Sequence, residues 1–268
     1  MYYSDCHVHT FFSPDSKTHP REHIEQAIRL GMDSLCFTDH MDFDYPPQYQ
    51  ISFDLDPKAY FPYMQKLRDE YDGKLKIRTG VEIGLETACQ QQISEYIQSN
   101  PWDFVIGSIH LSGRLDPYFA DYFEGRTVRE AYRAYFGSML SCLEAFDPIF
   151  DTLGHLDYIF RCGDQSITDA WSEWPDLMDA ILRLLLDKGI GLEVNTGGIK
   201  SGLTFQHPHD HLLARYRELG GELITLGSDA HSPDHLGDYF AQTGERLKAL
   251  GFRYYAVFAD RKPAFLAL

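Results

Sequence analysis

The chain has 268 residues, 44% of them hydrophobic, which is enough to bury a substantial core in one large α/β domain. Its 40 acidic residues outnumber 24 basic ones, and the formal charge of −16 argues against non-specific binding to nucleic acid or to anionic membranes. An anionic substrate would therefore need local positive charge, which bound metal ions supply.

The cysteines argue against a disulfide framework and against a thiolate zinc site. There are five of them, an odd number, and none has CxxC spacing. A polar strand with two histidines begins within a few residues of the N-terminus, so we expect no signal peptide, and no apolar run approaches membrane-spanning length. The sequence thus predicts a reduced, cytoplasmic protein without a membrane anchor.

Short apolar runs alternate with longer amphipathic segments along the chain. The predicted strands cover residues 4–9, 34–40, 76–84, 102–110, 151–157, 190–196 and 223–231, with an edge or extra closing strand at 253–258. The predicted helices cover residues 21–30, 57–71, 90–99, 127–146, 175–188, 208–219 and 235–250. Gly31 is expected to end the first helix, and Thr127 and Glu130 have the spacing of a capping box.

This alternation predicts a single domain over residues 1–268, because no linker, low-complexity tract or repeat interrupts it. Alternating strands and helices indicate a parallel sheet, and the number of units favours closure into a barrel. The carboxyl ends of the strands would then meet at one mouth. Two long loops rich in aromatic and acidic residues, 41–56 and 111–125, would lie beside it.

Good metal ligands stand at the ends of most predicted strands. His7 and His9 are two residues apart on one strand and therefore face the same side. The complete set contains imidazoles and carboxylates without a thiolate: His7, His9, His40, Glu82, His110, His155, Asp229 and His231. Such a set suits zinc, manganese or iron, and its size predicts two or three divalent ions. Glu82 is the best candidate to bridge two ions, because its carboxylate offers one oxygen to each.

Three acids close to these positions, Asp5, Asp39 and Asp157, are expected to accept hydrogen bonds from the ligand imidazoles and so to orient them. The alternative for each is an ordinary surface acid.

The same stretches resemble the motifs of the PHP (polymerase and histidinol phosphatase) superfamily, in order and over essentially the whole chain. They are His7-Val8-His9-Thr10, Thr38-Asp39-His40, Val81-Glu82, Ser108-Ile109-His110, Gly154-His155-Leu156-Asp157 and Ser228-Asp229-Ala230-His231. The Phe-Ser-Pro-Asp-Ser run after the first histidines, the Cys-Phe-Thr-Asp-His run and the chain length look most like the histidinol-phosphatase branch. That branch hydrolyses L-histidinol phosphate in histidine biosynthesis.

The resemblance implies a distorted (β/α)7 barrel with a trinuclear metal centre. Carried over by position, it gives three ligand sets: His7, His9, Glu82 and Asp229; Glu82, His110 and His155; and Asp15, His40 and His231. Some members of the superfamily have histidine where Asp15 stands. A carboxylate is a harder ligand than an imidazole, so this replacement changes which metal ions the third site would favour.

The chemistry expected from this centre is phosphate ester hydrolysis by a metal-bridging hydroxide, with Asp229 or His231 carrying a proton to the leaving alcohol. Arg161 is expected to hold the phosphate, since its planar donors suit bidentate contacts, and Lys200 is a second candidate for that contact. The aromatic and acidic loops would suit a substrate that carries an amine and an imidazole.

Other conspicuous residues are expected to have structural roles. Residues 207–211, His-Pro-His-Asp-His, would not bind metal if Pro208 opens a helix, because residues two apart on a helix do not face together. Cys6 and Cys36 are expected to pack in the core, and the pairs Gly197-Gly198 and Gly220-Gly221 to form turns or helix ends.

Three alternative functions are open at this point. A phosphoesterase of the same superfamily acting on another small ester or on a phosphodiester is the first, although no basic, aromatic groove for a nucleic acid is evident. An amidohydrolase is the second, but it would call for eight strands and often a lysine in place of Glu82. A non-catalytic barrel is the third, and it would be expected to have lost ligands.

Overall fold

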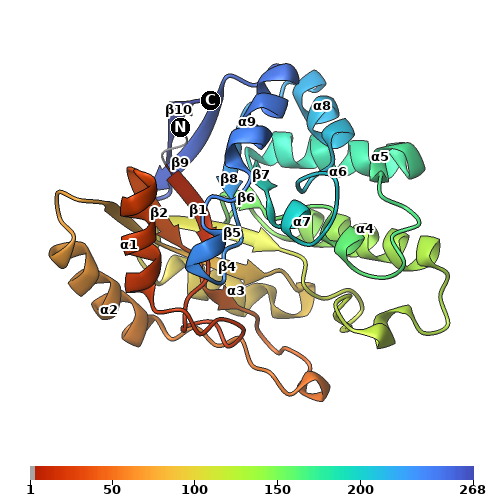
Figure 1. The fold of residues 1–268 in the computed structure, drawn as a ribbon. Coiled ribbons are helices and arrows are strands. Elements are labelled where there is room, and N and C mark those ends of the chain that lie inside the picture. Colours follow the sequence, from red (N-terminus) through yellow and green to blue (C-terminus); the bar gives the residue numbers. More distant parts are fainter. Residues whose placement is uncertain (1–3) are drawn as a thin grey trace.

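The computed structural model describes residues 4–268 and shows a barrel of parallel strands surrounded by helices (Figure 1). The strands pair in chain order, and β3 pairs with β4 beyond the end of β2. They are β1 (Ser4–Val8), β2 (Ser34–Phe37), β3 (His40–Met41), β4 (Lys76–Gly84), β5 (Phe104–Ser108), β6 (Thr152–Leu153), β7 (Gly191–Asn195) and β8 (Ile224–Gly227). All these pairings are parallel, as an alternation of strands and helices requires.

The barrel closes between its first and last strands. Backbone N–H groups of Asp229 and His9 donate to the carbonyls of His7 and Ala230, each at 2.9 Å, across the join between β1 and the end of β8. Seven strand positions followed by helices make this a distorted (β/α)7 barrel, so the predicted fold class is confirmed.

The helices pack around the barrel with their apolar faces inward. Their bounds are α1 (Pro20–Leu30), α2 (Pro57–Glu70), α3 (Gln90–Gln98), α4 (Val128–Ala145), α5 (Ala170–Glu173), α6 (Pro175–Lys188), α7 (Gly197–Lys200), α8 (Asp210–Glu218) and α9 (Phe240–Ala249). Gly31 ends α1 in the left-handed conformation at φ 71°, and Thr127 and Glu130 form the predicted capping box at the start of α4. Across residues 4–268, no helix combines the length and apolar character that a bilayer crossing requires.

The last part of the chain differs from the prediction of an edge or closing strand at 253–258. Strands β9 (Tyr254–Ala259) and β10 (Lys262–Ala267) form an antiparallel hairpin separate from the barrel sheet. The hairpin packs where the barrel strands begin: Phe258 stacks on Phe104 with ring centroids 5.0 Å apart, and Arg261 Nε lies 2.6 Å from Asp151.

Several elements are shorter than their predicted ranges. Strands β1, β5, β6 and β8 end before the polar residues that follow them, so those side chains stand on the loops at the mouth. Helix α8 begins at Asp210 rather than at Pro208, because His209 is its N-cap and accepts a hydrogen bond from the backbone N–H of His211. Residues 233–235 form a separate 3₁₀ turn before α9, so the predicted start of that helix at 235 was wrong.

Candidate metal centre

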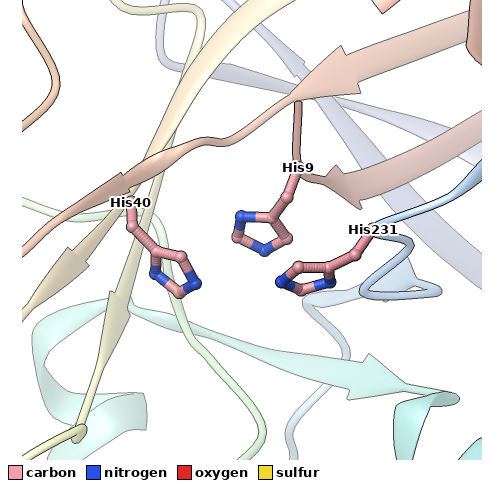
Figure 2. Close-up of side chains that lie close together, drawn as sticks. All are labelled: His9, His40 and His231. Atoms are coloured by element: carbon pink, nitrogen blue, oxygen red, sulfur yellow. The ribbon is translucent and has the colours of Figure 1, made fainter. Parts of the chain in front are cut away.

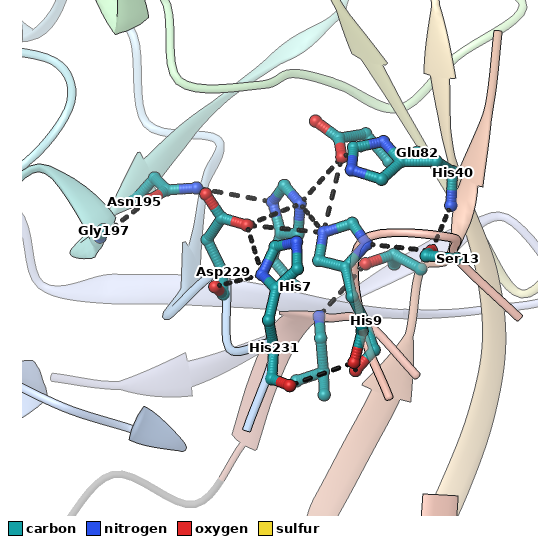
Figure 3. Close-up of polar contacts among 12 residues, drawn as sticks. His7, His9, Ser13, His40, Glu82, Asn195, Gly197, Asp229 and His231 are labelled. Carbon is teal, nitrogen blue, oxygen red and sulfur yellow. Dashed lines mark hydrogen bonds and ion pairs between the residues drawn. The ribbon is translucent and has the colours of Figure 1, made fainter. Parts of the chain in front are cut away.

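Residues at the ends of β1, β4 and β8 bring four candidate metal ligands to one point in the barrel mouth (Figure 3). The Nε2 atoms of His7 and His9 lie 2.9 Å apart. Glu82 Oε2 lies 3.2 Å from the first and 3.4 Å from the second. Asp229 Oδ1 completes the group at 3.9 Å from His7 and 3.4 Å from His9. All four side chains are buried, so water screens their charges weakly.

The Glu82 carboxylate faces two different sets of imidazoles. Its Oε2 is next to His7 and His9 and also lies 3.0 Å from His40 Nδ1. Its Oε1 lies 3.1 Å from His110 Nε2 and 2.8 Å from His155 Nε2. One carboxylate therefore stands between two groups of nitrogen atoms, which is the arrangement of a carboxylate that bridges two cations.

A third cluster lies beside the first two, formed by His9, His40 and His231 (Figure 2). The His9 ring stacks against both of the other rings, with centroids 4.3 Å from each, and the His40 and His231 centroids lie 6.2 Å apart, so the three rings form a triangle. Asp15 Oδ2 lies 3.4 Å from His40 Nε2 and 3.1 Å from His231 Nε2. The residues predicted for a third ion are therefore adjacent, although Asp15 is more exposed than the other candidates.

The tautomer of His231 follows from its contacts. Its Nδ1 lies 3.0 Å from the backbone carbonyl of Asp229, which can only accept, so Nδ1 carries the hydrogen. The Nε2 lone pair of the neutral ring then points at the Asp15 carboxylate, a pairing that requires a cation or a proton between the two atoms.

The buried ionisable groups in the mouth shift one another's pKa values. Burial alone would raise the pKa of Glu82, but the imidazoles of His7, His40 and His110 hold it well below its usual value. Burial, together with the neighbouring rings of His231 and His40, lowers the pKa of His9 well below its usual value. Ionised Glu82 and neutral His9 are the forms in which these two side chains can bind a metal ion.

These residues fit divalent metal ions. Within residues 4–268, Glu82 Oε2 accepts no hydrogen bond although it is fully buried. The separations of 2.9 to 3.9 Å among His7, His9, Glu82 and Asp229 bracket the roughly 3.3 Å expected between ligands around a tetrahedral zinc ion. The donor set of nitrogen and oxygen suits zinc, manganese or iron, as the sequence predicts.

The acids that orient the imidazoles are not those predicted. Glu193 on β7 lies 2.5 Å from His7 Nδ1 through Oε1, and its Oε2 accepts from the backbone N–H of His155 at 2.8 Å. Asp42 Oδ1 lies 2.7 Å from His110 Nδ1. Neither acid was singled out from the sequence. The available signal was the alternation of Glu193 and Asn195 on β7, which places both on the same side of that strand.

The three acids that were expected to orient ligand imidazoles have other partners, so that prediction was wrong. Asp5 accepts from the backbone N–H groups of Ser228 and Gly237, and it thereby ties the loop after β8 to β1. Asp39 accepts from Thr10 and Ser13, which are residues of the loop after β1.

Asp157 does bind an imidazole, but that ring belongs to His207, which lies outside the clusters at the mouth. Their Nδ1 to Oδ1 distance is 2.5 Å.

Of the two basic residues predicted to bind the substrate, Arg161 lines the pocket and Lys200 does not. Arg161 lines the pocket at the mouth, packs over the Tyr158 ring at 4.4 Å and donates to Asp229 Oδ2 at 3.1 Å. Within residues 4–268 its Nε has no partner. Lys200 instead donates to the backbone carbonyl of Asp229 at 3.2 Å and is absent from the described lining of the pocket.

The pocket above the three clusters has a volume of about 320 Å³. One wall consists of the candidate metal ligands and Arg161. The aromatic part of the lining comes from the two long loops and contains Tyr45, Ile51, Phe53, Tyr118 and Phe119. The pocket is therefore large enough for a small organic phosphate, with an aromatic surface beside the charged centre.

Residues 207–211 stay outside this centre, but the reason given from the sequence was wrong. His209 precedes α8, so its ring meets that of His211 with centroids 4.8 Å apart, and both rings lie near Asp169. The expected structural roles of the other residues are confirmed: Cys6 and Cys36 are buried thiols, Gly197-Gly198 opens α7, and Gly220-Gly221 follows the end of α8.

Comparison with known proteins gives consistent matches. The model of the PHP domain family matches residues 5–197. The histidinol-phosphatase of Lactococcus lactis is 36% identical over 264 residues, covering 96% of this chain and 95% of the relative, and a probable histidinol-phosphatase of Clostridium acetobutylicum is 33% identical, covering 87% and 88%. The crystal structure of the Lactococcus lactis histidinol phosphate phosphatase, complexed with zinc, L-histidinol and phosphate, superposes with a TM-score of 0.88 at 32% identity, covering 98% of this chain and 100% of that one.

Proposed function

The chain belongs to the PHP domain family, and from this we propose that it is a metal-dependent phosphomonoesterase that hydrolyses L-histidinol phosphate to L-histidinol and phosphate. This is a reaction of histidine biosynthesis. The similar structure from Lactococcus lactis holds zinc together with both products of that hydrolysis, which supports the assignment of metal, alcohol and phosphate to one pocket.

The observation that carries the proposal is the Glu82 carboxylate between two groups of imidazoles. Two or three divalent ions would be held by His7, His9, Glu82 and Asp229, by Glu82, His110 and His155, and by Asp15, His40 and His231. When bound, such ions neutralise charge on the phosphate oxygens and lower the pKa of water toward neutrality.

The protein groups around this centre position the substrate. The planar guanidinium of Arg161 lines the pocket and offers donors to the phosphate oxygens, while the contact with Asp229 fixes the orientation of the side chain. Arg161 also offsets negative charge that develops on the phosphoryl group during transfer.

Asp229 is the better candidate for moving a proton to the leaving alcohol. Its Oδ2 contacts Arg161, so it lies beside the place where the phosphate is held. His231, the other candidate, donates its Nδ1 hydrogen to a backbone carbonyl, which leaves Nε2 without a hydrogen to give. The contacts of His231 therefore suit metal ligation. Burial raises the pKa of Asp229, but its contact with His9 and the nearby Arg161 hold it well below its usual value, so Asp229 is ionised. Asp229 would therefore accept the proton that the attacking water loses and pass it to the leaving alcohol.

The function is tested by stripping the protein with a chelator and reconstituting it separately with zinc, manganese and iron. Phosphate release is then measured from L-histidinol phosphate, a nucleoside monophosphate and a phosphodiester. We expect no turnover before reconstitution and a clear preference for L-histidinol phosphate after it. Preferential cleavage of the phosphodiester, or no hydrolysis with any of the three metals, would overturn the proposal.

A further inference from the structure

One carboxylate in the pocket differs from the others. Asp15, Glu82 and Asp229 each lie within hydrogen-bonding distance of an imidazole or a guanidinium nitrogen. Asp116 also lines the pocket, yet within residues 4–268 it forms no ion pair. Its side chain accepts only neutral donors, the Tyr45 hydroxyl and the backbone N–H of Tyr118. The pocket thus contains an acid that no described cationic side chain contacts directly, although the nearby His110 imidazole lowers its pKa.

The position of Asp116 is well defined by contacts between the two long loops. Its Oδ2 accepts from Tyr45, and its backbone N–H donates to the Tyr49 hydroxyl at 3.1 Å. The Tyr49 ring stacks on Phe119 with centroids 4.2 Å apart and an angle of 11° between the planes. Because these contacts tie residues 41–56 to residues 111–125, Asp116 is held in place rather than free to turn into solvent.

An aromatic wall connects this carboxylate to the metal centre. The His40 ring meets Phe53 edge to face with centroids 4.9 Å apart, and Phe53 meets Tyr45 in the same way, also at 4.9 Å. Tyr45 then donates to Asp116. Asp116 consequently stands at one end of the wall, while the candidate ligand His40 stands at the other.

We propose that Asp116 binds the ammonium group of the substrate's alcohol moiety, so that the pocket selects phosphate esters of amino alcohols. The inference rests on the proposed function and names the group that confers its specificity. In L-histidinol phosphate, one oxygen and two carbons separate the ammonium nitrogen from phosphorus, so both charged ends fit in one small pocket. The imidazole of the substrate then lies against the aromatic wall.

Electrostatics favour this pairing. Burial raises the pKa of Asp116, although the hydrogen bonds from Tyr45 and Tyr118 oppose the shift. A partly desolvated carboxylate without a direct ion-pair partner is unfavourable, and an incoming ammonium group reduces that penalty by forming a charge-assisted hydrogen bond. Phosphate esters without a cationic group gain nothing from this interaction.

The test compares Asp116→Asn with the matched control Asp121→Asn. Asn lacks the charge and keeps one acceptor oxygen, which serves either the Tyr45 hydroxyl or the backbone N–H of Tyr118 but not both. Asp121 accepts from the Tyr49 hydroxyl at 3.0 Å and so joins the same two loops, but it does not line the described pocket. Both zinc-loaded variants are assayed with L-histidinol phosphate and with glycerol 3-phosphate, and their affinity for L-histidinol is measured by calorimetry.

Asp116→Asn is expected to lower kcat/KM for L-histidinol phosphate and the affinity for L-histidinol by about tenfold or more. Its kcat/KM for glycerol 3-phosphate stays close to that of the wild type, and Asp121→Asn changes none of these values. Equal losses on both esters would indicate a structural role for Asp116 and overturn the inference, as would an unchanged variant. A wild type that does not hydrolyse L-histidinol phosphate would overturn the proposed function, and L-histidinol binding would still decide the role of Asp116.

Discussion

Glu193 Oε1 lies 2.5 Å from Nδ1 of His7, and both side chains are fully enclosed in the barrel. The other oxygen of Glu193 accepts from the backbone N–H of His155. One carboxylate on β7 therefore holds two of the proposed metal ligands, which come from β1 and from the loop after β6. Its contact with Nδ1 fixes the orientation of the His7 ring and directs Nε2 toward Glu82.

Glu193→Gln is expected to weaken metal binding and to lower turnover by about 10- to 100-fold, because a neutral amide no longer fixes the His7 tautomer. The similar shape of the two side chains should preserve the fold. Metal content after dialysis against a weak chelator and the rate of phosphate release measure the effect. Glu95→Gln, on the exposed face of α3, is the control. Full metal content and a normal rate in Glu193→Gln would contradict the orienting role.

Gly227 on β8 is expected to tolerate no side chain, because a Cβ there would lie 2.5 Å from both Glu193 Oε1 and His7 Cβ. Gly227→Ala must therefore separate the two partners. We expect a loss of about 1 to 3 kcal/mol in the free energy of unfolding, measured by denaturant titration, together with lower metal content.

Gly137→Ala is a matched comparison, for which we expect the opposite change in the free energy of unfolding. It lies within α4, and a Cβ there would meet no atom within 4 Å. Gly137→Ala is expected to raise the free energy of unfolding by about 0.5 to 1 kcal/mol, since alanine loses less backbone entropy in a helix. Similar changes in the free energy of unfolding for the two substitutions would show that crowding around Gly227 does not determine the effect of an added side chain there.

Glu82→Ala is expected to abolish turnover and to remove the thermal stabilisation that zinc confers on the stripped protein. A ligand that binds only the folded state raises the unfolding midpoint, so the loss of the shared carboxylate appears directly in melting curves with and without zinc. Elemental analysis should show a parallel fall in bound metal. A zinc-dependent midpoint that survives in this variant would argue against Glu82 as a shared ligand.

His209→Ala is the control for Glu82→Ala, because His209 lies outside the barrel mouth and caps α8. Its metal content and turnover should stay near those of the wild type. The lost cap is expected to lower the free energy of unfolding by about 0.5 to 2 kcal/mol.

Arg161→Lys is expected to raise the KM for L-histidinol phosphate by about tenfold or more, because lysine keeps the charge but loses the planar pair of donors. Steady-state kinetics and inhibition by inorganic phosphate should change together if Arg161 contacts the phosphate. An unchanged KM with normal phosphate inhibition would show that this side chain serves only to hold Asp229.

The order of strands and helices, and the presence of ionisable residues where strands end, were predictable because they depend on local patterns. Apolar runs with period two or 3.6 identify elements wherever the chain later places them, and parallel strands necessarily bring their carboxyl ends together. This is why His7, His9 and Glu82 could be grouped before their separations were known. Their roles as metal ligands stay predictions to be tested by the variants described above.

The partners of these residues depended on the tertiary structure. Asp5 and Asp39 are adjacent to candidate ligands in sequence but bind backbone and hydroxyl groups, whereas Glu193 contacts His7 across a separation of 186 residues. Barrel closure and strand register decide which side chain meets which ring, and no local pattern encodes them. The same holds for the contact of Tyr45 with Asp116, since it joins two loops whose paths are set by packing rather than by periodicity.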